Sequence, residues 1–120
     1  MAPMGAMSPF FSEGANAMAI EAMSISPVPN VRFSPGTVVM TSGVQYHVTE
    51  GRLNPIVYLR RHLGGDWGDL RESDRSLNDT ALESGAARLF SSYQVDRALT
   101  LWIITEWDRS VTTLLLPSEY

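Results

Sequence analysis

The chain has 120 residues, a formal net charge of −4 and a sequence pI near 5.0. This length is typical of one domain, and the acidic balance argues against broad nucleic-acid binding, which uses clustered Lys and Arg. There is no cysteine and there are only two histidines, which excludes disulfides, thiol nucleophiles and a three-histidine metal site within one chain. All nine basic residues are arginine, which excludes a Schiff-base or P-loop lysine.

Residues 1–30 differ from the rest because they hold five of the six methionines and no basic residue. A secretory signal begins with positive charge, and a membrane span needs about eighteen consecutive apolar residues; this segment has neither. We therefore expect residues 1–30 to be a flexible Met/Pro/Ala-rich tail, residues 31–120 to be a single α+β domain, and the protein to be cytoplasmic and away from membranes. A second interpretation makes residues 15–25 a short helix that binds a partner.

The predicted domain begins with a turn and a strand. The Ser-Pro-Gly sequence at 34–36 is typical of a turn, because proline fixes φ and glycine accepts positive φ. Residues 37–41 are rich in β-branched side chains and predict a strand, which the Ser-Gly pair at 42–43 is expected to end. Residues 44–52 have mixed character and predict a loop with some extended structure.

Two helices are predicted next. Asn54 is a good N-terminal cap and Pro55 suits the first helical position, while Gly64 is placed at the C-terminal cap. The second helix is predicted over residues 73–84 and ends at Gly85. One side of it carries Leu77, Ala81 and Ser84.

Three strands complete the prediction, over residues 87–95, 99–107 and 111–116. Their short connections imply an antiparallel meander. We therefore predict an α+β fold of order β-α-α-β-β-β, with a small antiparallel sheet of three to four strands and two short helices packed on one face. Trp102 and Ile104 give the middle strand a second apolar face, which a partner is expected to cover; a homodimer is one candidate.

The most locally specific segment runs from His62 to Leu70, with three glycines, two aspartates and a tryptophan in nine positions. Ordering glycine costs more backbone entropy than ordering any other residue, which indicates a tight corner or a binding loop. We predict Asp66, Trp67 and Asp69 as binding residues. The structural alternative places Trp67 in the core and bonds both aspartates to nearby amides.

An enzymatic alternative uses the same segment. Closely spaced carboxylates on a glycine-containing loop suit Ca²⁺ or Mg²⁺, and a histidine beside an aspartate suits acid–base chemistry, so a small metal-dependent enzyme would use His62, Asp66 and Asp69. The spacing departs from the EF-hand template, and no nucleophile motif such as G-x-S-x-G occurs. We therefore expect no enzyme, with no catalytic residue, no metal and no cofactor.

Further candidate contacts lie at a predicted turn and at an arginine doublet. Trp107, Asp108 and Arg109 follow the strongest strand, and Trp and Arg are enriched at interface centres; the alternative is a solvated turn with a weak surface ion pair. Arg60 and Arg61 are also predicted as binding residues. In a plasmid-maintenance alternative they contact nucleic acid. The neighbouring aspartates argue against this alternative, because their negative charge weakens the attraction of the arginines for phosphate.

Motifs spread over residues 33–120 carry a resemblance. They include Ser-Pro-Gly-Thr at 34–37, Gly-Asp-Trp-Gly-Asp-Leu at 65–70, Trp-Ile-Ile-Thr-Glu at 102–106 and Thr-Thr-Leu-Leu-Leu-Pro at 112–117. They resemble a group of small plasmid-related or integrative-element accessory proteins of proteobacteria. The resemblance implies a mobile genetic element and no catalytic mechanism. We therefore predict a non-enzymatic accessory protein that binds a protein partner, one version of which inhibits a host defence complex as an anti-CRISPR protein does.

Overall fold

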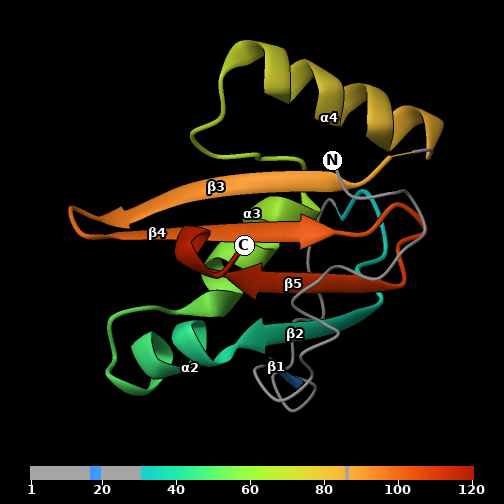
Figure 1. The fold of residues 1–120 in the computed structure, drawn as a ribbon. Helices are drawn as coiled ribbons and strands as arrows, with labels where there is room; N and C mark the ends of the chain where they lie inside the picture. Colours follow the sequence, from blue (N-terminus) through green and yellow to red (C-terminus); the bar gives the residue numbers. More distant parts are fainter. Residues whose placement is uncertain (1–16, 20–30, 86) are drawn as a thin grey trace.

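The fold is a mixed α+β domain, seen in a computed structural model that describes residues 17–19, 31–85 and 87–120 (Figure 1). The predicted α+β class and the order of the main elements are confirmed, with one helix added after the second strand. The described elements are β1 (Ala17–Ala19), β2 (Thr37–Thr41), α2 (Ser42–Thr49), α3 (Pro55–Leu63), α4 (Glu72–Ser84), β3 (Leu89–Asp96), β4 (Leu99–Thr105), β5 (Val111–Leu115) and the 3₁₀ helix η1 (Pro117–Glu119).

The sheet has the strand order β1-β2-β5-β4-β3 in the described part of the chain. β3 pairs antiparallel with β4, and β4 with β5, as predicted. β2 instead runs parallel to β5, with Thr37 opposite Val111 and Met40 opposite Leu114. The prediction of an antiparallel sheet is wrong at this pair. A parallel pair requires a long crossover, and the chain between β2 and β5 supplies it.

One strand comes from the segment predicted to be a tail. Ala17–Ala19 pairs antiparallel with β2, with Ala17 opposite Thr41 and Ala19 opposite Val39. At these three positions a strand therefore replaces both the predicted tail and the alternative helix over 15–25. The rest of that segment, 1–16 and 20–30, lies outside the described residues.

α2 forms where the sequence predicted a loop. Thr41 Oγ1 accepts a hydrogen bond from Val44 N at 3.3 Å, and the Glu119 carboxylate accepts from Thr41 Oγ1 at 2.5 Å and from Gly43 N at 3.0 Å. These bonds satisfy amides that a helix start leaves free. The prediction that the Ser-Gly pair leads into a loop is wrong. The Glu119 carboxylate that helps to cap this helix belongs to η1, far along the chain, and a local sequence pattern does not reveal it.

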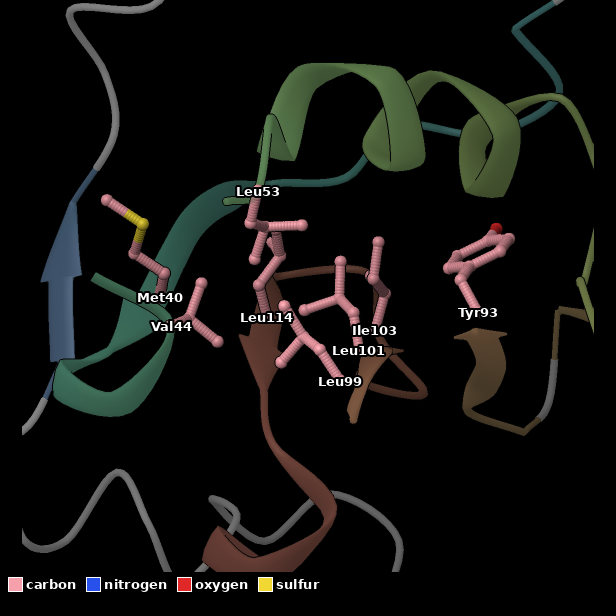
Figure 2. Close-up of a cluster of buried hydrophobic side chains, with 8 residues drawn as sticks. All are labelled: Met40, Val44, Leu53, Tyr93, Leu99, Leu101, Ile103 and Leu114. Carbon is pink, nitrogen blue, oxygen red and sulfur yellow. The ribbon is translucent and has the colours of Figure 1, made fainter. Parts of the chain in front are cut away.

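α3 and the main core agree with the predicted pattern. Asn54 Oδ1 accepts from Ile56 N at 3.2 Å, the helix begins at Pro55, and Gly64 is its C-terminal cap. α2 and α3 cover the same face of the sheet, and the core lies beneath them (Figures 1 and 2). Its buried members are Met40, Val44, Leu53, Tyr93, Leu99, Leu101, Ile103 and Leu114.

α4 lies beside the edge strand β3, away from the face that α3 covers (Figure 1). The Asn78 side chain donates from Nδ2 to Phe90 O at 2.6 Å and accepts from Phe90 N at 3.1 Å. Ala81 also joins a small buried cluster with Trp67 and Leu89. The prediction that both helices pack on one face is therefore wrong for α4, because its polar contact is with a strand edge.

Candidate binding site

The glycine-rich segment after α3 runs along the outer edge of β3. Ser92 N donates to Trp67 O at 3.1 Å, and Asp69 N donates to Ser92 O at 2.7 Å. Asp69 Oδ2 accepts from Gln94 N at 2.8 Å, and Gly68 pairs with Ser92 as a parallel bridge. Together with α4, this segment occupies backbone groups that an edge strand otherwise offers to another chain.

Trp67 is directed into the molecule and is only 2% exposed. Its Nε1 donates to Asp79 Oδ1 at 3.0 Å. Its ring stacks near Phe33 at 6.4 Å and meets His62 edge-on at 5.7 Å, measured between ring centroids. Trp67, predicted as a binding residue, thus contacts the interior.

Asp66 pairs with Arg61, the second residue of the arginine doublet. Arg61 Nε donates to Asp66 Oδ2 at 2.7 Å, and Gly68 N donates to Asp66 Oδ1 at 3.1 Å. The hydrogen bond from Arg61 holds the pKa of Asp66 below its ordinary value. The Arg61 guanidinium also lies 4.7 Å from the Tyr93 ring centroid, which favours a cation–π contact. Arg60, on the same helix, is exposed.

His62 lies in a buried chain of hydroxyl groups. Its Nδ1 is 2.5 Å from Ser91 Oγ, and its Nε2 is 2.9 Å from Thr105 Oγ1. Thr105 Oγ1 lies 2.6 Å from Thr112 Oγ1, which donates to Pro35 O at 2.8 Å. A carbonyl only accepts, so Thr112 donates to Pro35 O, Thr105 donates to Thr112, and His62 Nε2 donates to Thr105. In the neutral ring Nδ1 then accepts from Ser91.

Burial keeps the His62 ring neutral at pH 7. Its side chain is completely buried, and burial lowers its pKa to about 3. Ser91, which donates to the ring, is also fully buried. A serine beside a histidine suits nucleophilic catalysis only where a substrate reaches the hydroxyl, and this hydroxyl is enclosed.

The three residues of the metal-dependent alternative have other partners in this geometry. Both nitrogens of His62 bind hydroxyl groups, Asp66 holds Arg61, and Asp69 bonds to the backbone of Gln94. Among the residues that the structure describes, no three His, Cys, Asp or Glu side chains gather where they could hold a metal ion.

Arg109 connects the β4–β5 turn to α4. Its Nη1 donates to Ala87 O at 2.7 Å and to Trp107 O at 3.0 Å, and its Nη2 donates to Ala81 O at 3.1 Å. Its φ is 60°, which is uncommon outside glycine. Arg109, predicted as a partner contact, therefore serves as an internal clamp.

The other two predicted residues of this turn have different surroundings. Asp108 is exposed, and its Oδ1 accepts from Ser110 N at 3.0 Å and from Ser110 Oγ at 2.6 Å. These bonds hold the pKa of Asp108 below its ordinary value. Trp107 is half-buried, and its Nε1 is buried without a hydrogen-bond partner in the described part of the chain.

A groove of about 520 Å³ lies between α4 and the sheet face that carries Trp102 and Ile104. This volume is within the usual range of roughly 300–1,000 Å³ for ligand sites. The side of α4 predicted from helical spacing, with Leu77, Ala81 and Ser84, lines it. Further lining residues are Leu70, Phe90, Arg88 and Tyr120.

Aromatic rings and one arginine form the wall of the groove opposite α4. The Trp102 ring meets Phe90 at 5.0 Å and Tyr120 at 5.8 Å between centroids, both edge-on. Arg88 donates to the Tyr120 hydroxyl, and its guanidinium lies 5.5 Å from that ring. Trp, Tyr and Arg are the residue types most enriched at energetic centres of interfaces.

None of the eight predicted binding residues lines this groove. They are Arg60, Arg61, Asp66, Trp67, Asp69, Trp107, Asp108 and Arg109. The sequence signal that did locate it was the second apolar face of Trp102 and Ile104. Phe90 and Tyr120 were missed because a lone aromatic carries no information about which distant helix will face it.

Comparison with protein-family models, with curated proteins and with solved structures finds no match to this chain. Among the described residues, the helices are too short or too polar to cross a membrane. Function is therefore inferred from the geometry of the groove and of the residues around it.

Proposed function

We propose that this protein is a non-enzymatic binding protein and that the groove between α4 and the Trp102 face holds part of a protein partner. The observation that carries the proposal is Leu77, which is 68% exposed on the wall of an apolar groove. Covering such a side chain and the adjoining apolar wall removes apolar area from water, at roughly 25 cal/mol for each Å². A groove of this kind is a typical interaction site.

Two further observations support a protein as the occupant. The wall opposite Leu77 combines Trp102, Tyr120 and Arg88, which are the anchor types of protein interfaces. The residues considered for catalysis, His62, Asp66 and Asp69, are engaged in structural hydrogen bonds. The geometry thus favours binding over chemistry.

The resemblance to plasmid-related and integrative-element proteins supports a more specific role. On this proposal the protein is a cytoplasmic accessory of a mobile genetic element, and its partner belongs to the host. An inhibitor of a host defence complex, of the anti-CRISPR kind, is the version that we favour. A homodimer through the same groove is the competing outcome.

The experiment is affinity capture with the full chain and two matched variants. Leu77→Ser removes the exposed side chain of the groove, whereas Val57→Ser removes a side chain that is 48% exposed on α3. We expect one stoichiometric partner with the wild type and Val57→Ser, and its loss with Leu77→Ser at unchanged melting temperature. A partner that Leu77→Ser retains fully, or a folded protein that captures nothing, contradicts the proposal. Light scattering of the purified chain reports the homodimer.

A further inference from the structure

The groove runs along one face of α4. Asp74, Leu77, Ala81 and Ser84 all line it, and residues three or four apart share one face of a helix. From Asp74 to Ser84 the helix rises by about 15 Å. The groove is therefore long enough for about three turns of a second helix laid beside α4.

The groove offers no strand edge to an extended peptide. β4 lies between β3 and β5, so its backbone groups are paired within the sheet. On the outer side of β3, the Asn78 side chain bonds to both backbone groups of Phe90. Ser92 donates to Trp67 O and accepts from Asp69 N. An extended peptide in the groove would therefore bury N–H and C=O groups without partners, which costs free energy.

An α-helix avoids this cost because its backbone hydrogen bonds lie within the segment. Only a stripe of apolar side chains, at spacings i, i+3, i+4 and i+7, must then face the groove. The groove supplies a matching apolar surface, with Leu77 on one side and Trp102 and Ile104 on the other. The form of the groove thus favours a helix as its occupant.

The charged residues of the groove lie at its two ends. Asp74 is in the first turn of α4, and Arg88 follows the end of α4, just before β3. Asp74 forms a loose ion pair with Arg71, at 3.6 Å between Oδ2 and Nε. Arg88 lies near Glu106 and donates to the Tyr120 hydroxyl. A carboxylate accepts up to about four hydrogen bonds and a guanidinium donates five, so both groups can form a further bond.

These two charges complement the two ends of a helix. The N-terminus of a helix has free N–H groups and a partial positive charge, and its C-terminus has free carbonyls and a partial negative charge. Asp74 suits the first end and Arg88 suits the second. The complementarity fixes a direction for the bound helix, the same direction as that of α4.

We propose that the partner presents an amphipathic α-helix to the groove, laid along α4 with its N-terminus at Asp74 and its C-terminus at Arg88. This inference rests on the proposed function and adds the form and the direction of the bound segment. The apolar stripe of the helix covers Leu77 and Trp102. Asp74 accepts from N–H groups of its first turn, and Arg88 donates to its last carbonyls.

The first test selects binders from a display library of random peptides of about fourteen residues, a length near the minimum for an isolated helix. The immobilised full chain captures them, while an excess of the Leu77→Ser variant in solution removes peptides that bind elsewhere. We expect the retained sequences to share apolar residues at i, i+3 or i+4, and i+7. Strict alternation of apolar and polar residues, the pattern of an extended segment, would overturn the helix.

A proline substitution tests the helix in one selected peptide. At a polar position in the middle of the peptide, proline breaks a helix, whereas alanine preserves it. Fluorescence anisotropy measures the binding of each form to the full chain. We expect proline to weaken binding by at least about tenfold and alanine by less than about twofold. Equal affinities of the two forms would contradict a bound helix.

The direction of the helix is tested at its N-terminus. The same peptide is synthesised with a free α-amino group and with an acetyl group, which removes that charge. The affinity of the free form relative to the acetylated form should be about two- to fivefold lower in Asp74→Asn than in the wild type. Glu83→Gln, which removes an exposed carboxylate from α4, should leave this ratio unchanged. A ratio that Asp74→Asn does not alter overturns the assigned direction.

The proposed function has its own readout in these assays. Leu77→Ser should weaken the selected peptide by at least about tenfold, and Val57→Ser should leave its affinity unchanged. If the selection retains no peptide that depends on Leu77, the groove proposal fails. If the retained peptides depend on Leu77 but tolerate proline, only the helix inference fails.

Discussion

The side-chain amide of Asn78 pairs with both backbone groups of Phe90, donating to its carbonyl at 2.6 Å and accepting from its N–H at 3.1 Å. A side chain of α4 thus occupies the place that another strand would take at the edge of the sheet. The pairing also holds α4 against β3, which pairs with the strand that carries Trp102, and Asn78 itself lines the groove. Asn78 therefore contributes to the groove as well as protecting the edge of β3.

Asn78→Asp should destabilise the fold. The carboxylate keeps one acceptor but loses the donor to Phe90 O, which leaves a buried carbonyl unpaired beside a negative charge. We expect the free energy of unfolding to fall by about 2–3 kcal/mol, measured by urea unfolding with tryptophan fluorescence. Asn54→Asp is the control, since aspartate caps a helix as well as asparagine. Equal effects at the two positions would show that the Phe90 pairing contributes little.

Gly68→Ala should be much more costly than Gly51→Ala. Both glycines have positive φ, +79° and +76°, so alanine is strained at either position. A Cβ at Gly68 would lie 2.1 Å from Ser92 O, whereas nothing lies within 4 Å of one at Gly51. We expect Gly51→Ala to cost about 1–2 kcal/mol, and Gly68→Ala to cost at least about 2 kcal/mol more. Similar melting temperatures would contradict the close approach of this segment to β3.

Local signals predicted the helix ends and the main strands well. Asn54 and Pro55 start α3, Gly64 ends it and Gly85 ends α4, because each acts through its immediate neighbours. The alternating apolar residues of β3, β4 and β5 follow from a period of two, which the sequence displays directly.

Features that depend on distant residues could not be predicted in this way. α2 is capped by Glu119, and β2 pairs with β5, so neither is encoded near its own position. The candidate site is similar: Leu77 and Trp102 each gave an apolar signal, but they line one groove only because α4 lies beside β3, where Asn78 bonds to Phe90. The sequence predicts Arg109 as a partner contact and gives no sign of its internal bonds, because its acceptors, such as Ala81 O, lie in other elements.

His62 should make the fold sensitive to mild acid. Its pKa is about 3 in the folded state against an ordinary 6.5, so the unfolded chain binds a proton that the folded chain does not. Stability is therefore fully present above pH 6.5 and falls as the pH decreases below it, by about 1.4 kcal/mol for each pH unit. Urea unfolding between about pH 7 and pH 5 measures this slope.

Two variants make the assignment to His62 specific. His62→Gln should lower stability at pH 7 but remove the slope, since glutamine does not titrate. Glu106, whose pKa is raised by burial, acts with the opposite sign, because its protonation on acidification stabilises the folded state. Glu106→Gln should therefore steepen the slope. A slope that survives in His62→Gln would assign the acid sensitivity to other groups.

Arg109→Lys should destabilise the contact between the β4–β5 turn and α4. The guanidinium reaches carbonyls in two directions, Ala87 O from Nη1 and Ala81 O from Nη2, and an ammonium group cannot reproduce this fork. We expect the free energy of unfolding to fall by about 1–3 kcal/mol, and thermal unfolding measures this loss. Arg97→Lys, at an exposed position in the β3–β4 turn, should be neutral. A neutral Arg109→Lys would argue against the clamp.

The most direct test of the groove is site-specific photocrosslinking in the host cell. A photoreactive benzoylphenylalanine replaces Leu77 in one variant and Val57 in another, both of them exposed apolar positions. We predict one adduct of defined mass, containing a single partner protein, from position 77 and none from position 57. Equal adducts from the two positions, or none from position 77 in a folded protein, would contradict the assignment of the groove as the binding site.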